Sequence, residues 1–183
     1  MVIREMKVTD QANTCLVAFG SNQPFQELST PLDVVQKALP RLLSLSQNAL
    51  LGVSALYQSD PVPPSDQPKF VNGCLIFQTI LSPEAILQGL LDIELDFGRK
   101  RSVPNAARTL DLDLIAYESL VMASDFLTLP HPRMQDRGFV LKPAADVWPD
   151  WQHPVLNKPL TQLLSPLDCS DLVAIRQPFR ISR

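Results

Sequence analysis

Hydrophobic and polar positions follow two different periods along this chain, and the order of these periods predicts an α+β fold. Four strands are predicted, over residues 13–19, 49–58, 70–80 and 109–117. Apolar and polar residues alternate in 109–117, whereas 13–19 and 70–80 are apolar strand-like runs. Apolar residues three to four positions apart predict two helices, over residues 31–44 and 83–97. The resulting order, strand–helix–strand–strand–helix–strand, is that of a ferredoxin-like βαββαβ core.

Local signals set where the predicted helices begin and end. Thr30 and Ser82 are N-cap residues, and each is followed by a proline at the first helical position, where no helical hydrogen bond is lost. Gly98 is expected to end the second helix near its C-cap. Pro40 is expected to kink the first helix or shift its frame, because it lacks an amide hydrogen. Residues 20–22, Gly-Ser-Asn, predict a turn after the first strand.

Beyond residue 118 the pattern predicts a C-terminal extension of a short strand and helices. It indicates a strand over 127–129, a helix over 137–146 and one helical turn at 160–164, within a chain punctuated by prolines. A chain of 183 residues is long enough to bury about two-thirds of the surface that it exposes when unfolded. We therefore expect a flexible N-terminal arm, residues 1–12, and a single domain, residues 13–183.

The composition excludes several functional classes. With 45% hydrophobic residues, 19% charged residues and a net charge of −3, the chain is neither disordered nor a protein that coats nucleic acid by bulk charge. Its three cysteines lie far apart without metal-site spacing, which indicates free thiols in a reducing compartment. No apolar run approaches the roughly 18 residues of a membrane span, and no signal sequence is expected. We therefore expect a cytoplasmic monomer without nucleic-acid or membrane partners.

The strongest chemical signal is a pair of aspartates in the fourth predicted strand. Asp111 and Asp113 are two positions apart, so their side chains share one face, whereas the leucines that alternate with them face a core. Two neighbouring carboxylates repel each other, and magnesium, which one or two carboxylates hold together with substrate phosphates, relieves this repulsion. Four basic residues precede the pair without an intervening acid: Arg99, Lys100, Arg101 and Arg108. The combination favours a nucleoside triphosphate site, and two solvated acids on an edge strand are the simpler alternative.

Six short segments form an ordered set along the chain. They are residues 19–22 (FGSN), 67–72 (QPKFVN), 93–99 (IELDFGR), 108–113 (RTLDLD), 130–134 (PHPRM) and 137–141 (RGFVL). Each is weak alone. Together, over residues 16–164, they resemble the 6-hydroxymethyl-7,8-dihydropterin pyrophosphokinases of folate synthesis.

The resemblance implies transfer of a pyrophosphoryl group from ATP to the hydroxymethyl group of the pterin, with release of AMP. It implies two magnesium ions bridged by Asp111 and Asp113, and it makes these two residues, with Arg99 and Arg108, the catalytic set. For the pterin it implies contacts from Ser59, Val62, Phe70, Asn72 and Phe139. For ATP it implies contacts from Glu94, Arg99, Arg108, His131 and Arg137. The acceptor of the hydroxyl proton is left open between Asp113 and a water molecule.

The segment before Arg108 departs from the family pattern. The family usually has a basic residue, a tryptophan and Gly-Pro there, in a loop that closes over the substrates, and this chain has Pro104, Asn105, Ala106 and Ala107. Loss of a large aromatic contact weakens binding by about 1–3 kcal/mol. The resemblance therefore implies an intact metal site with an altered lid.

Two other functions remain as alternatives. A nucleotidyl transferase or cyclase also carries paired aspartates on a ferredoxin-like sheet and releases pyrophosphate, but it does not explain Asn72 and Phe139. A degenerate, non-catalytic relative would bind ATP or pterin without turnover; the altered lid favours this function and the aspartate pair opposes it. For single residues, the alternatives are a solvent-facing Asn72, a core Phe139 and a His131 that only fixes a turn between two prolines.

Overall fold

The computed structural model describes residues 12–45, 49–99 and 106–175. Residues 1–11 of the expected arm, the basic pair Lys100 and Arg101, and the lid residues Pro104 and Asn105 lie outside these ranges. The main sheet is antiparallel, in the order β10–β3–β4–β1–β5, and β2 also pairs with β4. Its strands are β1 (Asn13–Ser21), β2 (Ala49–Val53), β3 (Tyr57–Ser59), β4 (Phe70–Thr79), β5 (Asp111–Tyr117) and β10 (Val173–Ala174).

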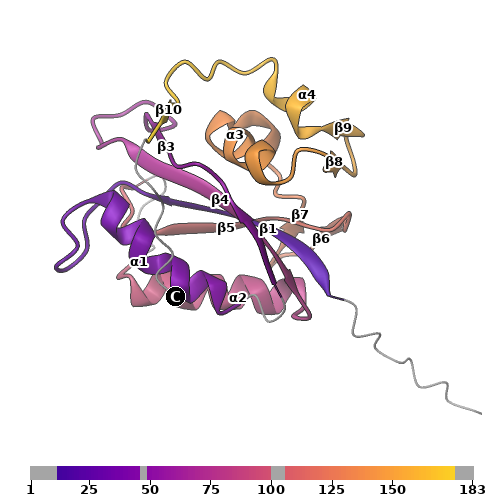
Figure 1. Cartoon of the computed structure of the whole chain (residues 1–183), viewed down its shortest axis with the longest axis horizontal. Coiled ribbons are helices and arrows are strands. Elements are labelled where there is room, and N and C mark those ends of the chain that lie inside the picture. The colour runs from indigo at the N-terminus through magenta and orange to yellow at the C-terminus, as the bar shows by residue number, and fades with distance from the viewer. Residues whose placement is uncertain (1–11, 46–48, 100–105, 176–183) are drawn as a thin grey trace, which may run out of the picture.

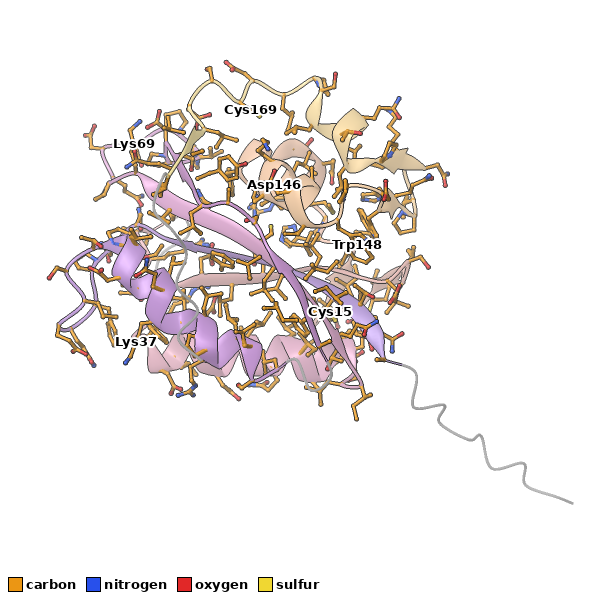
Figure 2. All side chains as sticks on the ribbon, in the orientation of Figure 1. Cys15, Lys37, Lys69, Asp146, Trp148 and Cys169 are labelled. Carbon is orange, nitrogen blue, oxygen red and sulfur yellow. The ribbon has the colours of Figure 1, made fainter. Side chains whose placement is uncertain are left out.

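Helices cover both faces of this sheet (Figure 1). α1 (Pro31–Leu43) and α2 (Pro83–Asp96) lie on one face, and α3 (Gly138–Val147) with the short α4 (Leu160–Leu164) lies on the other. Figure 2 shows the same layers through side chains, with Lys37 on α1 and Asp146 on α3 on opposite sides of the sheet. The strand order and the helix positions confirm the ferredoxin-like core that the periodicity predicted.

Each face of the sheet has its own hydrophobic core. The core under α1 and α2 includes the three leucines that alternate with the aspartates, Leu110, Leu112 and Leu114, as predicted. The core under α3 and α4 includes Leu141 and Ile115. β1 supplies alternate residues to both cores, so this central strand is buried along most of its length. A rigid central strand is therefore available to position a site at its end.

The predicted helix starts are confirmed. Thr30 Oγ1 accepts a hydrogen bond from the Asp33 amide at 3.2 Å, and the Asp33 carboxylate accepts one from the Thr30 amide at 2.9 Å, which completes a capping box. Ser82 Oγ accepts a hydrogen bond from the Ala85 amide at 3.2 Å. α1 continues past Pro40 to Leu43, so this proline does not end the helix. Gly98, with φ +72°, follows α2 in the left-handed region that favours glycine.

Two predicted strand boundaries were wrong. Gly20 and Ser21, expected in a turn, stay in β1 because both pair with β4, and Gly20 also pairs with β5. The strand predicted over residues 49–58 is divided into β2 and β3 at residues 54–56. There the Ser54 main-chain amide donates to the Cys74 carbonyl at 2.9 Å, but the Cys74 amide donates to the Ser54 hydroxyl, also at 2.9 Å, so a side chain takes one of the two ladder bonds.

The C-terminal extension folds onto this core. The strand predicted near 127–129 is β7 (Thr128–Leu129), and its partner β6 (Met122–Ala123) was not predicted. A 3₁₀ turn, η1 (Met134–Asp136), leads into α3, and β8 (Gln152–His153) pairs with β9 (Lys158–Pro159) before α4. β10 then returns to the edge of the main sheet beside β3. Among the described residues, no helix is both long enough and apolar enough to cross a membrane.

Candidate active site

A cavity of about 160 Å³ opens where β1, β4 and β5 lie side by side. Its walls come from the ends of these strands, from the proline-rich loop over residues 60–69 and from the first turn of α3. The proline-rich loop is held at both ends, because Lys69 pairs with Asp60 at 2.8 Å and the Asp60 amide donates to the Asp171 carboxylate at 3.2 Å. The lining residues used below are Gly20, Ser59, Val62, Phe70, Asn72, Arg108, Asp111, Asp113, Arg137 and Phe139.

Strand register places Asn72 and Asp111 on one face of the sheet, on either side of β1. Gly20 on β1 lies opposite Asn72 on β4 and opposite Asp111 on β5. Residues directly opposite each other point to the same face of a sheet, and two strand spacings separate Asn72 from Asp111 by about 9–10 Å of backbone. A Cβ atom on Gly20 would lie 3.0 Å from Asn72 Oδ1, so the missing side chain leaves room for the asparagine.

Asp111 is held by two arginines. Arg99 Nη1 lies 2.7 Å from Asp111 Oδ1, and Arg108 Nη1 forms an ion pair with Asp111 Oδ2. Burial acts to raise the pKa of the Asp111 carboxyl, but the charges of Arg99 and Arg108, together with the hydrogen bond from Arg108, outweigh it and hold that pKa below its ordinary value. The carboxylate therefore stays ionised at neutral pH, as a metal ligand or an electrostatic group must.

Asp113 faces a second cationic group. Arg137 Nη1 lies 3.5 Å from Asp113 Oδ2, and His131 Nε2 lies 4.0 Å from the same oxygen. Burial lowers the pKa of His131 more than Asp113 raises it, and the charges of Arg137 and Arg133 lower it further. His131 is therefore a neutral imidazole at pH 7. Its Nδ1 accepts a hydrogen bond from the Arg133 amide at 3.2 Å, which leaves Nε2 on the side of Asp113.

Glu94 lies beneath the site on α2. Its side chain is 1% exposed, accepts the Leu112 amide hydrogen at 2.7 Å and forms an ion pair with Arg99. Because Leu112 lies between Asp111 and Asp113, this carboxylate anchors the strand that carries both aspartates. It also orients the guanidinium of Arg99 toward Asp111.

Residues predicted to bind the pterin form the other end of the cavity. Asn72 Nδ2 donates to Ser59 Oγ at 2.9 Å, and both side chains are buried. Val62 is 66% exposed and borders the cavity from the proline-rich loop. Phe139 lies on the first turn of α3, and the guanidinium carbon of Arg137 lies 5.7 Å from the centre of its ring. Phe70 and Phe139 line the same cavity as Asn72.

The donor set fits a hard cation that also binds phosphate. Within the described residues no group of three or more His, Cys, Asp and Glu side chains could hold a metal alone. Two carboxylates with substrate phosphates suffice for magnesium. Asp111 Oδ1 is buried without a well-formed hydrogen bond, although Arg99 lies close to it, so this oxygen retains coordination capacity. The two aspartates therefore fit the proposed magnesium ions.

The structure brings most of the predicted site residues to one cavity. All five residues expected to contact the pterin border it, as do Asp111, Asp113, Arg108 and Arg137. Glu94, Arg99 and His131 are not among its lining residues; Arg99 and His131 reach it through the two aspartates, and Glu94 acts one layer below. Gly20, which the sequence did not single out as a site residue, also lines this cavity. Its sequence signals were the segment 19–22 of the family resemblance and the turn predicted over residues 20–22.

The comparisons with known proteins identify the family. A family model described as 7,8-dihydro-6-hydroxymethylpterin-pyrophosphokinase matches residues 16–149. The chain belongs to this family. A Synechocystis protein named 2-amino-4-hydroxy-6-hydroxymethyldihydropteridine pyrophosphokinase is 39% identical over 160 residues, which cover 87% of this chain and 79% of that protein. The Pseudomonas aeruginosa protein of the same name is 43% identical over 138 residues, which cover 75% of this chain and 82% of that protein.

Members of the pyrophosphokinase family also occur within longer chains. The Schizosaccharomyces pombe folic acid synthesis protein fol1 is 36% identical over 151 residues, and the match covers 82% of this chain but 20% of that protein. Among solved structures, a Plasmodium falciparum HPPK-DHPS triple mutant has a TM-score of 0.66 at 12% identity; the match covers 85% of this chain and 43% of that chain. At this identity the structural match shows the fold alone. The sequence matches confirm the family resemblance and favour it over a nucleotidyl transferase.

Proposed function

We propose that this chain transfers the β,γ-pyrophosphoryl group of ATP to the hydroxymethyl oxygen of 6-hydroxymethyl-7,8-dihydropterin, in folate synthesis. A bond forms between that oxygen and the β-phosphorus, the bond from the β-phosphorus to the α,β-bridging oxygen breaks, and AMP leaves. The observation that carries the proposal is the register across β4, β1 and β5, which sets Asn72 and Asp111 on either side of Gly20 in one cavity of a chain of this family.

The pterin end supplies recognition. Asn72, fixed by its hydrogen bond to Ser59, would meet the amide-like edge of the pterin, and Phe70 and Phe139 would cover its ring faces. Val62 and the main chain near Ser59 would close the side of the pocket. These contacts would hold the hydroxymethyl group toward Asp111 and Asp113, so that two reactants meet in one orientation.

The phosphate end supplies positive charge. Arg99, Arg108 and Arg137 converge on the two aspartates, and their guanidinium groups would bind a triphosphate there. Glu94 would act on ATP through the Arg99 guanidinium that it holds. His131, neutral and oriented through Nδ1, would donate from Nε2 to a phosphate oxygen.

Magnesium completes the proposed site. Asp111 and Asp113 would hold two ions, as their shared face and their place in the cavity allow. Bound magnesium would neutralise charge on the triphosphate and lower the pKa of the pterin hydroxyl. The side chains themselves would bind and orient the two substrates.

We also propose that the enzyme works as a cytoplasmic monomer formed by a single domain. All groups assigned to the site come from one chain, and ATP and reduced thiols are features of the cytoplasm. Light scattering of the purified protein tests the monomeric state, because a dimer at micromolar concentration would contradict it.

Nucleotide product analysis tests the proposed function. Purified protein is mixed with ATP, magnesium and 6-hydroxymethyl-7,8-dihydropterin, and AMP, ADP and pyrophosphate are separated. We expect pterin-dependent AMP without free pyrophosphate, and loss of AMP formation in Asp113→Asn, which preserves side-chain volume. Release of pyrophosphate would instead indicate a nucleotidyl transferase. Binding of both substrates without any product would indicate a non-catalytic relative.

A further inference from the structure

Asn22 joins two segments that the proposed reaction uses separately. It follows β1 directly, its side chain is fully buried at 0% exposure, and it is not among the residues that line the cavity. A buried carboxamide has two acceptor positions and two donor hydrogens, and leaving them unpaired is costly. The partners of this amide are therefore informative about its role.

The oxygen of this carboxamide holds the segment that carries Arg108. Asn22 Oδ1 accepts the main-chain amide hydrogen of Arg108 at 2.7 Å. The main-chain amide of Asn22 in turn donates to the Arg108 carbonyl at 3.1 Å. The main chain of Arg108 is thus fixed on both sides, three residues before Asp111. From this position the Arg108 guanidinium reaches the Asp111 carboxylate.

The nitrogen of the same carboxamide holds the end of the proline-rich loop. Asn22 Nδ2 donates to Gln67 Oε1 at 3.1 Å and to the Pro68 carbonyl at 3.2 Å. The orientation of the amide follows from its partners: the Arg108 amide can only donate and the Pro68 carbonyl can only accept. Pro68 leads into β4, two residues before Phe70 and four before Asn72.

We propose that Asn22 is a positioning residue that couples the pterin end of the cavity to the phosphate end. Its oxygen sets the position of Arg108 for transfer, and its nitrogen sets the proline-rich loop for pterin binding. The inference rests on the proposed function, and it assigns a separate role to the oxygen and to the nitrogen of one buried side chain. No other common side chain of this size both donates two hydrogen bonds and accepts one at these positions.

Two substitutions separate the halves of the amide. Asn22→Asp keeps an oxygen for the Arg108 amide but removes both donor hydrogens, so we expect the KM for pterin to rise about tenfold while kcat changes less than about threefold. Asn22→Ala removes both halves, so we expect the same rise in KM together with a kcat that is lower by about tenfold. The KM for ATP should change less than the KM for pterin in Asn22→Asp.

Ser54→Ala is the matched control. Ser54 is also buried and its hydroxyl also accepts a main-chain amide, that of Cys74 at 2.9 Å, but it lies away from the cavity. We expect this variant to lower the melting temperature while leaving both KM values near those of the wild type. A KM for pterin in Asn22→Asp that matches the Ser54→Ala value would overturn the proposal, because Asn22 would then only stabilise the fold.

The kcat values of Asn22→Asp and Asn22→Ala test the role of Asn22 Oδ1 in holding Arg108. If Asn22→Asp lowers kcat as far as Asn22→Ala does, the assignment of Oδ1 to Arg108 is overturned. Should Asn22→Ala not fold, the isosteric Asn22→Asp against the wild type decides the question through the KM for pterin. Wild-type turnover is measured first. Absence of pterin-dependent AMP in the wild type would contradict the proposed function. If the wild type is active, the KM and kcat values of the variants relative to it test only the coupling through Asn22.

Discussion

Gly20 is a position where a missing side chain is part of the site. It lies between Asn72 and Asp111 in the sheet, and a Cβ atom there would lie 3.0 Å from Asn72 Oδ1. Its conformation is that of an ordinary strand, so the requirement for glycine comes from close approach and not from backbone strain. The residue thus determines where the carboxamide of Asn72 can lie.

We predict that Gly20→Ala displaces the Asn72 carboxamide and weakens pterin binding about tenfold, with a smaller effect on ATP. Isothermal titration calorimetry with each substrate separately measures both affinities. Gly52→Ala in β2 is the matched control, because its Cβ would meet Ile76 and Val147 at ordinary distances of 3.5 and 3.6 Å. Equal losses for pterin and ATP in Gly20→Ala would show that the methyl group disturbs the whole site instead.

The two histidines of this chain allow a direct test of the phosphate end. The pKa of His131 lies below its ordinary value because of burial and the neighbouring Arg137 and Arg133, with Asp113 opposing. Anionic phosphates beside Nε2 favour the protonated imidazolium, so we predict that ATP with magnesium raises the pKa of His131.

Proton NMR titration with and without the nucleotide measures this change. His153 on β8 is the internal control, because burial also lowers its pKa. The centre of its ring lies 5.7 Å from that of Trp151, and neither residue lines the cavity. We expect its pKa to stay the same when ATP is added. A pKa of His131 that does not respond to ATP would remove this residue from the proposed phosphate contacts.

At the scale of elements, the contact between α2 and β5 supports the catalytic strand. Glu94 on α2 accepts the Leu112 amide and pairs with Arg99, so one buried carboxylate holds both the strand and a cation of the site. Removing one partner of a buried ion pair leaves an uncompensated charge, which costs far more than the net contribution of the intact pair. The helix therefore contributes to the site without reaching the cavity.

We predict that Glu94→Ala lowers the free energy of unfolding by about 3–5 kcal/mol. Urea denaturation measures it. Asp92→Ala on the same helix is the control. Asp92 is exposed, and its carboxylate accepts a hydrogen bond from Gln88, one helical turn away, at 2.9 Å, so a change of less than about 0.5 kcal/mol is expected. Glu94→Gln, which keeps an acceptor for Leu112, should lose less stability than Glu94→Ala. Equal stability of Glu94→Ala and Asp92→Ala would mean that β5 is held by its sheet pairing alone.

At the scale of the whole molecule, helices cover both faces of the sheet, and the site lies at the ends of three neighbouring strands. β1 contributes to both hydrophobic cores, and the cavity forms where this buried strand meets the ends of β4 and β5. The C-terminal extension also bears on the site. Tyr57 on β3 donates to Asp146 on α3 at 2.7 Å, and α3 carries Phe139 over the sheet (Figure 2 labels Asp146).

The sequence by itself determined the elements and the chemistry that repeats locally. Helical spacing of apolar residues predicted α1 and α2, alternation predicted β5, and short apolar runs predicted β1 and β4, which are buried on both faces of the sheet. The same alternation placed Asp111 and Asp113 on one face and the intervening leucines in the core, as the structure confirms. The caps at Thr30 and Ser82 were predictable because their partners lie only three residues away.

Only the tertiary structure decided which distant residues act together. Asn22 bonds to residues 45, 46 and 86 positions away, and Glu94 bonds to Leu112 across 18 positions. No local period records such contacts, so Gly20 and Ser21 were predicted in a turn and the contact of Glu94 with β5 was not predicted. The split between β2 and β3 was missed for the same reason, because the amide that Ser54 accepts belongs to Cys74 in another strand. The local pattern of residues determines the helices and strands. The contacts that connect these elements depend on residues that are far apart in the sequence and meet only when the chain is folded.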